Sequence, residues 1–389
     1  MDTTTQRPLA APALFRARAA ISAAFLLMGF GVGLWAGHIP IIQDKLSIDL
    51  SVIGFALLTM AIGAMVSMPL SGWVVGHIGS RRPTAIAMIA YLIIVPTPLL
   101  AGTVPLLFVA AFFFGFSLGA FDVVANVQAS EIETARGRPT MSSFHAFYSI
   151  GTMIGAAAAG FLIFIGWSGG FGAAFVCVFA VTLGVGAAGR FYPSDPKPGE
   201  GPHFALPNRV LFGLGAICFF AYAIEGAVTD WSALYLTDVL DATPARATTG
   251  LVLFSLAMAG FRLFGDPIVE RLGRRAVLAG GGVICSVGLA ITIAAPWPLL
   301  ASVGFGLVGV GAANIVPVLF SWGARTPGIP PGVGVAAIAT TGYLGFLSAP
   351  PILGFIADGY GLSTSLFVVL IMGLVMAVLG FTRKRPPPA

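Results

Sequence analysis

The chain has 389 residues, of which 57% are hydrophobic and only 9% are charged, and its formal net charge is +5. Soluble domains carry roughly 25% charged residues, so this composition excludes a soluble enzyme and indicates a protein embedded in a lipid bilayer. The excess of basic residues does not indicate nucleic-acid binding, because these residues lie in short loops between apolar segments, where they report membrane orientation.

Apolar segments long enough to cross a bilayer follow one another along almost the whole chain. A spanning helix needs about 20 apolar residues, and the segments of this length are 19–41, 50–76, 83–102, 104–129, 141–165, 168–190, 209–237, 247–266, 276–295, 298–322, 332–356 and 362–382. The N-terminal residues before them form a polar tail without a signal-peptide cleavage site. The sequence therefore predicts an all-α integral membrane protein with twelve transmembrane helices.

The loops between these segments differ in charge. One alternate set carries nearly all the basic loop residues, such as Arg81 and Arg274, whereas the opposite set carries Lys45 and Arg246 beside several aspartates. By the positive-inside rule the basic set is cytoplasmic. We therefore expect a multi-pass protein of the cytoplasmic (inner) membrane, with both termini in the cytoplasm.

The longest hydrophilic connection, 191–208, is rich in proline and glycine and has no room for a globular fold. It separates six predicted spans from six, so we expect an N-terminal bundle (1–190), a cytoplasmic linker (191–208) and a C-terminal bundle (209–389). The halves also share a glycine followed by arginines, at Gly79 and at Gly273, after their second spans. This duplication is typical of carriers built as two pseudo-symmetric six-helix bundles with a substrate site between them.

The repeated loop resembles the signature of the major facilitator superfamily, and the resemblance covers essentially the whole chain. The second copy matches well, whereas in the first copy Gly76 stands where the signature has an acidic residue. The resemblance implies the major facilitator fold and a cytoplasmic latch that holds the outward-facing state, with the C-terminal copy carrying more of this role. The latch residues are then Gly72, Gly79, Arg81, Arg82, Glu270, Arg271, Gly273 and Arg274.

Four further stretches are similar to the fucose-permease-like branch of that superfamily. They are Phe121 to Gln128, Phe144 to Gly151, Glu225 to Ser232, and Gly342 to Gly345 together with Pro350 and Pro351. The resemblance implies a polar, sugar-like or other metabolite solute. One fold hosts many substrates, so the solute itself stays open.

Polar residues recur at helical spacing on three otherwise apolar spans, and each set forms one stripe. The stripes contain Asp122 and Asn126 in span four, His145, Ser149 and Thr152 in span five, and Tyr222, Glu225, Thr229 and Ser232 in span seven. Such stripes are costly against lipid. We expect them to line a common water-filled cavity.

Asp122 is the first candidate for a proton-coupling carboxylate, because a low dielectric favours the neutral form of an acid and makes its protonation respond to cavity opening. The alternative is a fixed hydrogen-bonding group between helices. His145 can exchange protons with Asp122, since histidine titrates near neutral pH, or it can be a packing residue. Glu225 is the third coupling candidate.

Two further groups complete the predicted site. Arg262 in span eight needs an acidic partner, and Asp266 one turn away predicts a structural pair; the alternative is an anion-binding Arg262. Aromatic and amide side chains suit a neutral polar solute. The predicted substrate-binding residues are Trp35, His38, Asn126, Tyr148, Ser149, Tyr222, Asn314 and Tyr343, and for Trp35 a role as an interface anchor is the alternative.

The leading hypothesis is a proton-coupled secondary transporter of a small organic solute that works by alternating access, and we expect it to function as a monomer. Efflux of an apolar or drug-like compound is the alternative, and a membrane-embedded enzyme or a non-transporting sensor is a remote one. The sequence contains no HExxH, GxSxG or P-loop motif. The three cysteines lie apart in apolar runs, so we expect no cofactor, metal, nucleic-acid partner or enzymatic activity.

Overall fold

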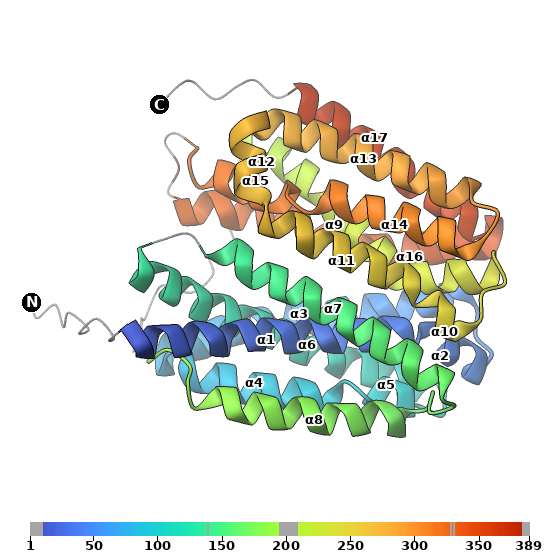
Figure 1. The fold of residues 1–389 in the computed structure, drawn as a ribbon, viewed down its shortest axis with the longest axis horizontal. Coiled ribbons are helices and arrows are strands. Elements are labelled where there is room, and N and C mark those ends of the chain that lie inside the picture. Colours follow the sequence, from blue (N-terminus) through green and yellow to red (C-terminus); the bar gives the residue numbers. More distant parts are fainter. Residues whose placement is uncertain (1–10, 138–139, 194–208, 327–328, 330, 383–389) are drawn as a thin grey trace, which may run out of the picture.

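The computed structural model describes residues 11–137, 140–193, 209–326, 329 and 331–382, which form long helices joined by short turns (Figure 1). The described residues of the first half form eight helices: α1 (Ala11–Gly37), α2 (Ile39–Leu46), α3 (Leu50–Ile78), α4 (Arg81–Ile94), α5 (Thr97–Leu100), α6 (Val104–Arg136), α7 (Met141–Phe164) and α8 (Gly170–Ala188). The predicted linker, 191–208, lies outside the described residues from 194 onward.

The second half contains nine described helices and lies beside the first. They are α9 (Arg209–Asp238), α10 (Pro244–Ala247), α11 (Thr249–Leu263), α12 (Gly265–Leu272), α13 (Arg274–Ala294), α14 (Pro298–Ala312), α15 (Ile315–Gly323), α16 (Pro331–Tyr360) and α17 (Leu362–Thr382). The chain thus forms two helical bundles, which contact each other where α7 packs on α11 and where α3 packs on α16.

Eleven segments among the described residues are long and apolar enough to cross a membrane. The sequence predicted a further continuous span at 247–266, and the structure corrects it: this segment is divided among α10, α11 and α12. Pro267 is the physical reason for the second break, because it has no N–H to donate to the carbonyl of Leu263 and its ring crowds that carbonyl. Together α10, α11 and α12 occupy the place of the eighth of twelve spans.

The two halves repeat one turn in detail. Gly79 ends α3 with φ of 76° and donates its N–H to the carbonyl of Val75 at 2.9 Å, and Gly273 ends α12 with φ of 80° and donates to Val269 at 2.9 Å. Positive φ is a conformation that glycine adopts at low cost. The shared glycine therefore marks equivalent positions in the two bundles.

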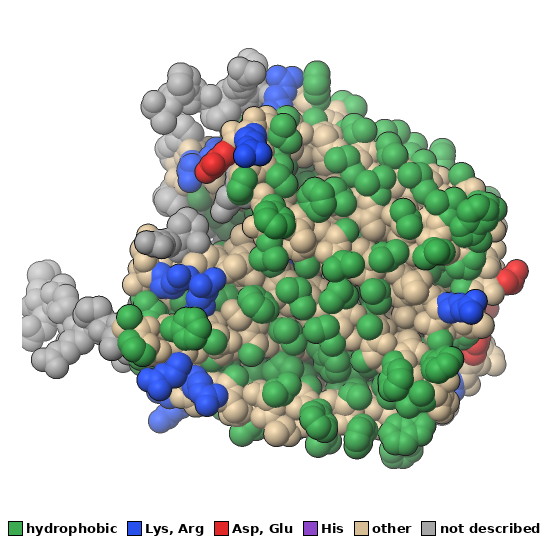
Figure 2. All heavy atoms as spheres, viewed as in Figure 1, with side chains coloured by type: hydrophobic (Ala, Val, Ile, Leu, Met, Phe, Trp, Pro, Cys, Tyr) green, Lys and Arg blue, Asp and Glu red, His purple; other side chains and the backbone are tan. Residues whose placement is uncertain are grey.

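The start of α1 and the end of α17 lie at the same end of the helices, which we call the terminus end (Figure 1). Hydrophobic side chains cover the flanks of the molecule, and Lys and Arg side chains gather mainly at the terminus end (Figure 2). Large side chains such as Phe164 and Phe171 are 79% and 85% exposed. An exposed apolar flank of this extent matches hydrocarbon rather than water.

The halves also contact each other at the end of the molecule away from the termini, which we call the opposite end. The N–H of Ser51 donates to a carboxylate oxygen of Asp358 at 2.9 Å. Nearby, a Cβ added to Gly54 would meet the backbone of Pro350, and one added to Gly37 would overlap the Ala159 side chain and touch Thr248. The missing side chains thus allow the two bundles to approach at this end.

Candidate functional site

The aspartate of α6 faces the other half of the molecule. Its Oδ2 accepts a hydrogen bond from the hydroxyl of Tyr343 on α16 at 3.4 Å. Its Oδ1 accepts one from the side-chain amide of Asn126, one turn along α6, at 3.0 Å. Asp122 remains partly exposed in the middle of a long helix, so surrounding side chains do not enclose it completely.

Arg262, near the end of α11, connects three other segments. Its Nη1 donates to the hydroxyl of Ser149 on α7 at 2.9 Å, and its Nε donates to the carbonyl of Ala313 at 3.3 Å. Its Nη2 lies 3.5 Å from a carboxylate oxygen of Glu225 on α9. The side chains of Arg262 and Glu225 are 7% and 15% exposed, so this ion pair is largely removed from water and each charge has its partner.

The position of Arg262 follows from a proline in the neighbouring span. Pro317 stands four residues after Ala313 and has no N–H, so it cannot make the helical hydrogen bond to the Ala313 carbonyl. The helix breaks there, between α14 and α15. The guanidinium of Arg262 supplies the missing donor, because a buried carbonyl without a partner is costly.

The break in α14–α15 also supports the end of α11. The side-chain amide of Asn314 donates to the carbonyl of Phe261 at 3.1 Å, and the hydroxyl of Ser142 on α7 donates to the carbonyl of Arg262 at 3.2 Å. Gly265 lies directly against the Asn314 side chain, where an added Cβ would overlap it. Two interrupted helices therefore satisfy each other's free backbone groups.

Aromatic rings lie between the aspartate and the ion pair. Tyr222 of α9 stacks on Phe346 of α16 with ring centroids 4.6 Å apart, and its centroid lies 5.6 Å from that of Tyr343. Tyr148 of α7 lies close enough to Glu225, Asp122 and Arg262 to interact with them electrostatically. These rings offer flat apolar faces and hydroxyl groups next to the charged residues.

The structure places His145, Trp35 and His38 outside these direct contacts. The His145 ring packs edge-on against Phe25, with centroids 5.3 Å apart, and interacts electrostatically with Arg262. Among the described residues no hydrogen bond joins it to Asp122. Trp35 and His38 are buried, and their ring atoms Nε1 and Nε2 have no partner among the described residues. Their predicted roles in coupling and substrate binding stay predictions.

The predicted partner of Arg262 was Asp266, whose side chain lies outside the described part of the structure. That pairing stays a prediction, and the described partner is Glu225, 37 residues earlier in the chain. Sequence reasoning placed Arg262 in a structural pair and missed its contacts with Ser149 and Ala313. An arginine in an apolar span and a proline in a later one were the available signals.

The loop residues of the predicted latch lie at the terminus end. Glu270 and Arg271 are exposed, and Arg81 donates to the carbonyl of Gly189 at the end of α8 at 3.0 Å. Beside the first loop, the hydroxyl of Ser80 donates to a carboxylate oxygen of Glu131 on α6 at 2.7 Å. The N-terminal half therefore has a carboxylate next to this loop, although Gly76 does not supply one.

The described residues contain no group of three or more His, Cys, Asp or Glu side chains that could hold a metal ion, and all three cysteines are free and buried. The candidate site, formed by the residues around Asp122 and Arg262, contains one ion pair, one carboxylate with uncharged partners, and aromatic and hydroxyl groups from both halves. Such a set can bind a small polar molecule and respond to a proton.

Comparisons with known proteins agree with this architecture. The Major Facilitator Superfamily model matches residues 21–240 and 211–389. An uncharacterized MFS-type transporter of Yersinia pestis is 34% identical over 354 residues, which cover 91% of this chain and 92% of that protein.

Two solved structures share the fold at low sequence identity. The D-xylose-proton symporter has a TM-score of 0.74 at 14% identity and covers 95% of this chain and 97% of its own. A mutant of the nucleoside transporter NupG has a TM-score of 0.72 at 14% identity and covers 94% of this chain and 98% of its own. Because the family model matches both halves and a relative aligns over nearly the full length, the chain belongs to the Major Facilitator Superfamily.

Proposed function

We propose that this chain is a proton-coupled secondary transporter that moves a small, uncharged polar solute, sugar-like or another polar metabolite, by alternating access between its two bundles. Membership of the superfamily supports solute transport, and the observation that carries the finer proposal is the hydrogen bond from Tyr343 to Asp122. This bond joins a carboxylate of the first half to a hydroxyl of the second, near the middle of both helices.

Charge balance supports Asp122 over Glu225 as the coupling group. Glu225 has Arg262 as its counter-charge, whereas the hydrogen-bond partners of Asp122, Asn126 and Tyr343, are uncharged. In a low dielectric, a carboxylate without a nearby cation is costly to keep ionised. Protonation therefore stabilises such a carboxylate more than one that already has a counter-charge. Protonation also turns an acceptor oxygen into a donor, so it changes the bond to Tyr343 and links the proton to the contact between halves.

The same charge balance favours a neutral solute. An anion would find the guanidinium of Arg262 already occupied by Glu225, Ser149 and a backbone carbonyl. Tyr222 and Phe346 present a stacked pair of rings beside these polar groups, and flat aromatic faces with adjacent hydroxyls suit a sugar-like ring. The D-xylose and nucleoside carriers of similar fold, both named for neutral polar solutes, agree with this class.

The same aromatic pair also favours the alternative function, efflux of an apolar or drug-like compound. Such a compound would use the rings and leave the hydroxyl groups unpaired. We prefer the polar solute because Tyr343, Asn126 and Ser149 place hydrogen-bonding groups in the same region. Binding of an apolar ligand would remove water from these groups without offering new hydrogen bonds, which costs free energy.

The test uses the purified chain in liposomes with an imposed pH gradient and a panel of neutral sugars, nucleosides and polyols. For one proton per solute, a gradient of one pH unit supports about ten-fold accumulation. Asp122→Asn should retain exchange of labelled solute across the membrane and lose this accumulation, because the amide keeps the shape but not the proton site. Full accumulation by Asp122→Asn would remove Asp122 from the coupling role.

Asp49→Asn is the matched control. Asp49 is an exposed carboxylate at the start of α3 whose side chain makes no capping hydrogen bond, so this variant should accumulate solute like the unmodified chain. If no neutral polar solute moves while apolar dyes are expelled by the same liposomes, efflux replaces the proposed function.

A further inference from the structure

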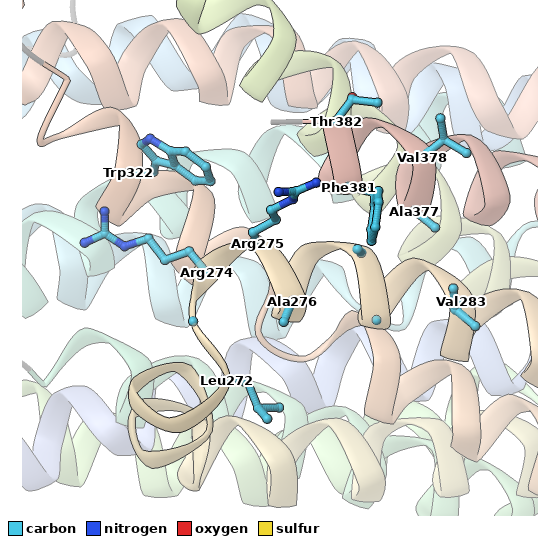
Figure 3. A pocket seen from close by; sticks show the side chains of 13 residues that line it. Leu272, Arg274, Arg275, Ala276, Val283, Trp322, Ala377, Val378, Phe381 and Thr382 are labelled. Carbon is cyan, nitrogen blue, oxygen red and sulfur yellow. The ribbon is translucent and has the colours of Figure 1, made fainter. Parts of the chain in front are cut away.

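A groove opens on the C-terminal half at the terminus end, between the first turns of α13 and the last turns of α17. Its volume is about 1030 Å³, and Trp322 of α15 lines it from one side (Figure 3). Helix α13 begins at Arg274 and α17 ends at Thr382, and both are candidate membrane spans. The groove therefore begins where two spanning helices reach the membrane surface.

The walls of the groove change character along its length. From Arg274 to Val283 the axis of α13 advances by about 14 Å, which leads from the membrane surface into the hydrocarbon. The deeper wall is apolar, and Val283 and Val378 on its two sides are 48% and 61% exposed. A hydrocarbon chain can lie along such a wall without removing any polar group from water.

The surface end of the groove is cationic. Arg274 and Arg275 line it, and none of its thirteen lining residues is acidic. In Figure 3 the guanidinium of Arg275 lies between the rings of Trp322 and Phe381, and its Cζ is 4.6 Å from the centre of the Phe381 ring. Arg325 lies near enough to Arg274 for their like charges to repel. An anion placed here would relieve that repulsion.

The arginine equivalent to Arg275 in the other half makes a hydrogen bond to the end of a neighbouring span. Aligning the two positive-φ glycines, Gly79 and Gly273, makes Arg81 the counterpart of Arg275. Arg81 donates to the carbonyl of Gly189 at the end of α8, the sixth span of its half. Arg275 instead lies over Phe381 at the end of the twelfth span, and its buried Nε has no hydrogen-bond partner among the described residues.

We propose that this groove binds an anionic phospholipid, with its anionic headgroup at Arg274 and Arg275 and one acyl chain along Val283 and Val378. Three features select this occupant: two arginines at the surface end, whose guanidinium groups bind phosphate, an indole at the interface depth, and an apolar wall that continues into the bilayer. A soluble anion would use the arginines and leave the wall empty, whereas a zwitterionic lipid would bring a cation toward them. Basic pockets between spanning helices on the anionic leaflet hold lipid headgroups by this chemistry.

Quenching of Trp322 fluorescence by lipid tests the proposal in vesicles that contain the full chain. The probes are phosphatidylglycerol and phosphatidylcholine, each brominated in the upper acyl chain, and the signal of Trp322 is the difference between the unmodified chain and Trp322→Phe. Brominated phosphatidylglycerol should quench this signal at a lower mole fraction than brominated phosphatidylcholine. The preference should fall about five-fold for each arginine replaced, in Arg274→Gln and Arg275→Gln.

Two variants separate a lipid site from general attraction to the membrane. Arg275→Lys keeps the positive charge and should keep most of the preference for phosphatidylglycerol. This variant also shows whether a loss of preference in Arg275→Gln comes from loss of charge or from loss of folding. Arg81→Gln removes the counterpart arginine from the other half and should leave the preference unchanged. Equal quenching by the two lipids in the unmodified chain, or a preference that survives Arg274→Gln/Arg275→Gln, would overturn the proposal. Loss of the preference on adding inorganic phosphate would assign the arginines to a soluble anion instead.

Discussion

The guanidinium Nε of Arg262 donates to the backbone carbonyl of Ala313 at 3.3 Å, and Pro317 is the reason that this carbonyl is free. In return Asn314, beside Ala313, donates its side-chain amide to Phe261, beside Arg262, at 3.1 Å. Two broken spans of the C-terminal half are therefore joined by reciprocal hydrogen bonds. The same arginine holds Glu225 and Ser149, so the joint lies next to the contact between halves.

Removal of the Arg262 charge should destabilise the chain by leaving Glu225 without a cation. Arg262→Gln is expected to cost about 2 to 3 kcal/mol of unfolding free energy, because a largely buried carboxylate then has no counter-charge. Adding Glu225→Gln to this variant should recover part of the loss. Thermal unfolding of Arg262→Gln, Glu225→Gln and the double variant in detergent measures the coupling, and additive losses would contradict the ion pair.

Replacement of Pro317 should relieve the helix break. Pro317→Ala supplies an N–H that can bond the Ala313 carbonyl within the helix, so we expect unfolding free energy to rise by about 1 kcal/mol. Arg262 then loses one of its acceptors, and solute exchange should slow several-fold if the break works as a hinge. Both quantities are measured on one preparation, by thermal unfolding and by exchange in liposomes.

Pro69→Ala is the control for that experiment, since Pro69 lies inside α3, away from the joint between α11 and α14–α15. It should leave the exchange rate close to that of the unmodified chain. An equal slowing in both variants would mean that the helix break at Pro317 has no special role.

The contact between Asp122 and Tyr343 should appear as non-additive kinetics. Tyr343→Phe removes the hydroxyl donor and is expected to reduce the initial rate of gradient-driven uptake about five-fold, the equivalent of about 1 kcal/mol for one hydrogen bond. In the Asp122→Asn background the same replacement should have little further effect, because the coupling carboxylate is already absent. Full additivity of the two losses would show that the residues act separately.

The latch prediction rests on Glu270, which lies in the short helix α12. Glu270→Gln should slow transport or shift the chain toward the inward-facing state, because the acidic group of the C-terminal signature is removed while Arg271 and Arg274 remain. Transport rate and the labelling of introduced cysteines report these effects, and the buried native cysteines keep the background low. Asp44→Asn, an exposed carboxylate at the opposite end, is the control, and unchanged rates and labelling in Glu270→Gln would contradict the prediction.

The residues of the candidate site could be predicted from the sequence, but their contacts could not. Asp122, Glu225, Tyr222 and Tyr343 are candidates because polar side chains in apolar spans are costly and therefore rare. Their pairing was not visible, since Tyr343 reaches Asp122 across 221 positions of the chain. Pro267 is visible in the sequence, yet the span was predicted as continuous, because hydropathy does not take account of a missing backbone N–H.

The sequence by itself determined that this protein is a helical membrane protein with two related halves, because hydrophobic runs, loop charges and repeated glycine turns are local properties that each segment carries alone. Only the tertiary structure decided that Arg262 pairs with Glu225 and donates a hydrogen bond to Ala313, and that the guanidinium of Arg275 lies over the Phe381 ring. Those contacts depend on the rotation and tilt of each helix against its neighbours. Packing of whole bundles sets these angles, and no single segment encodes them.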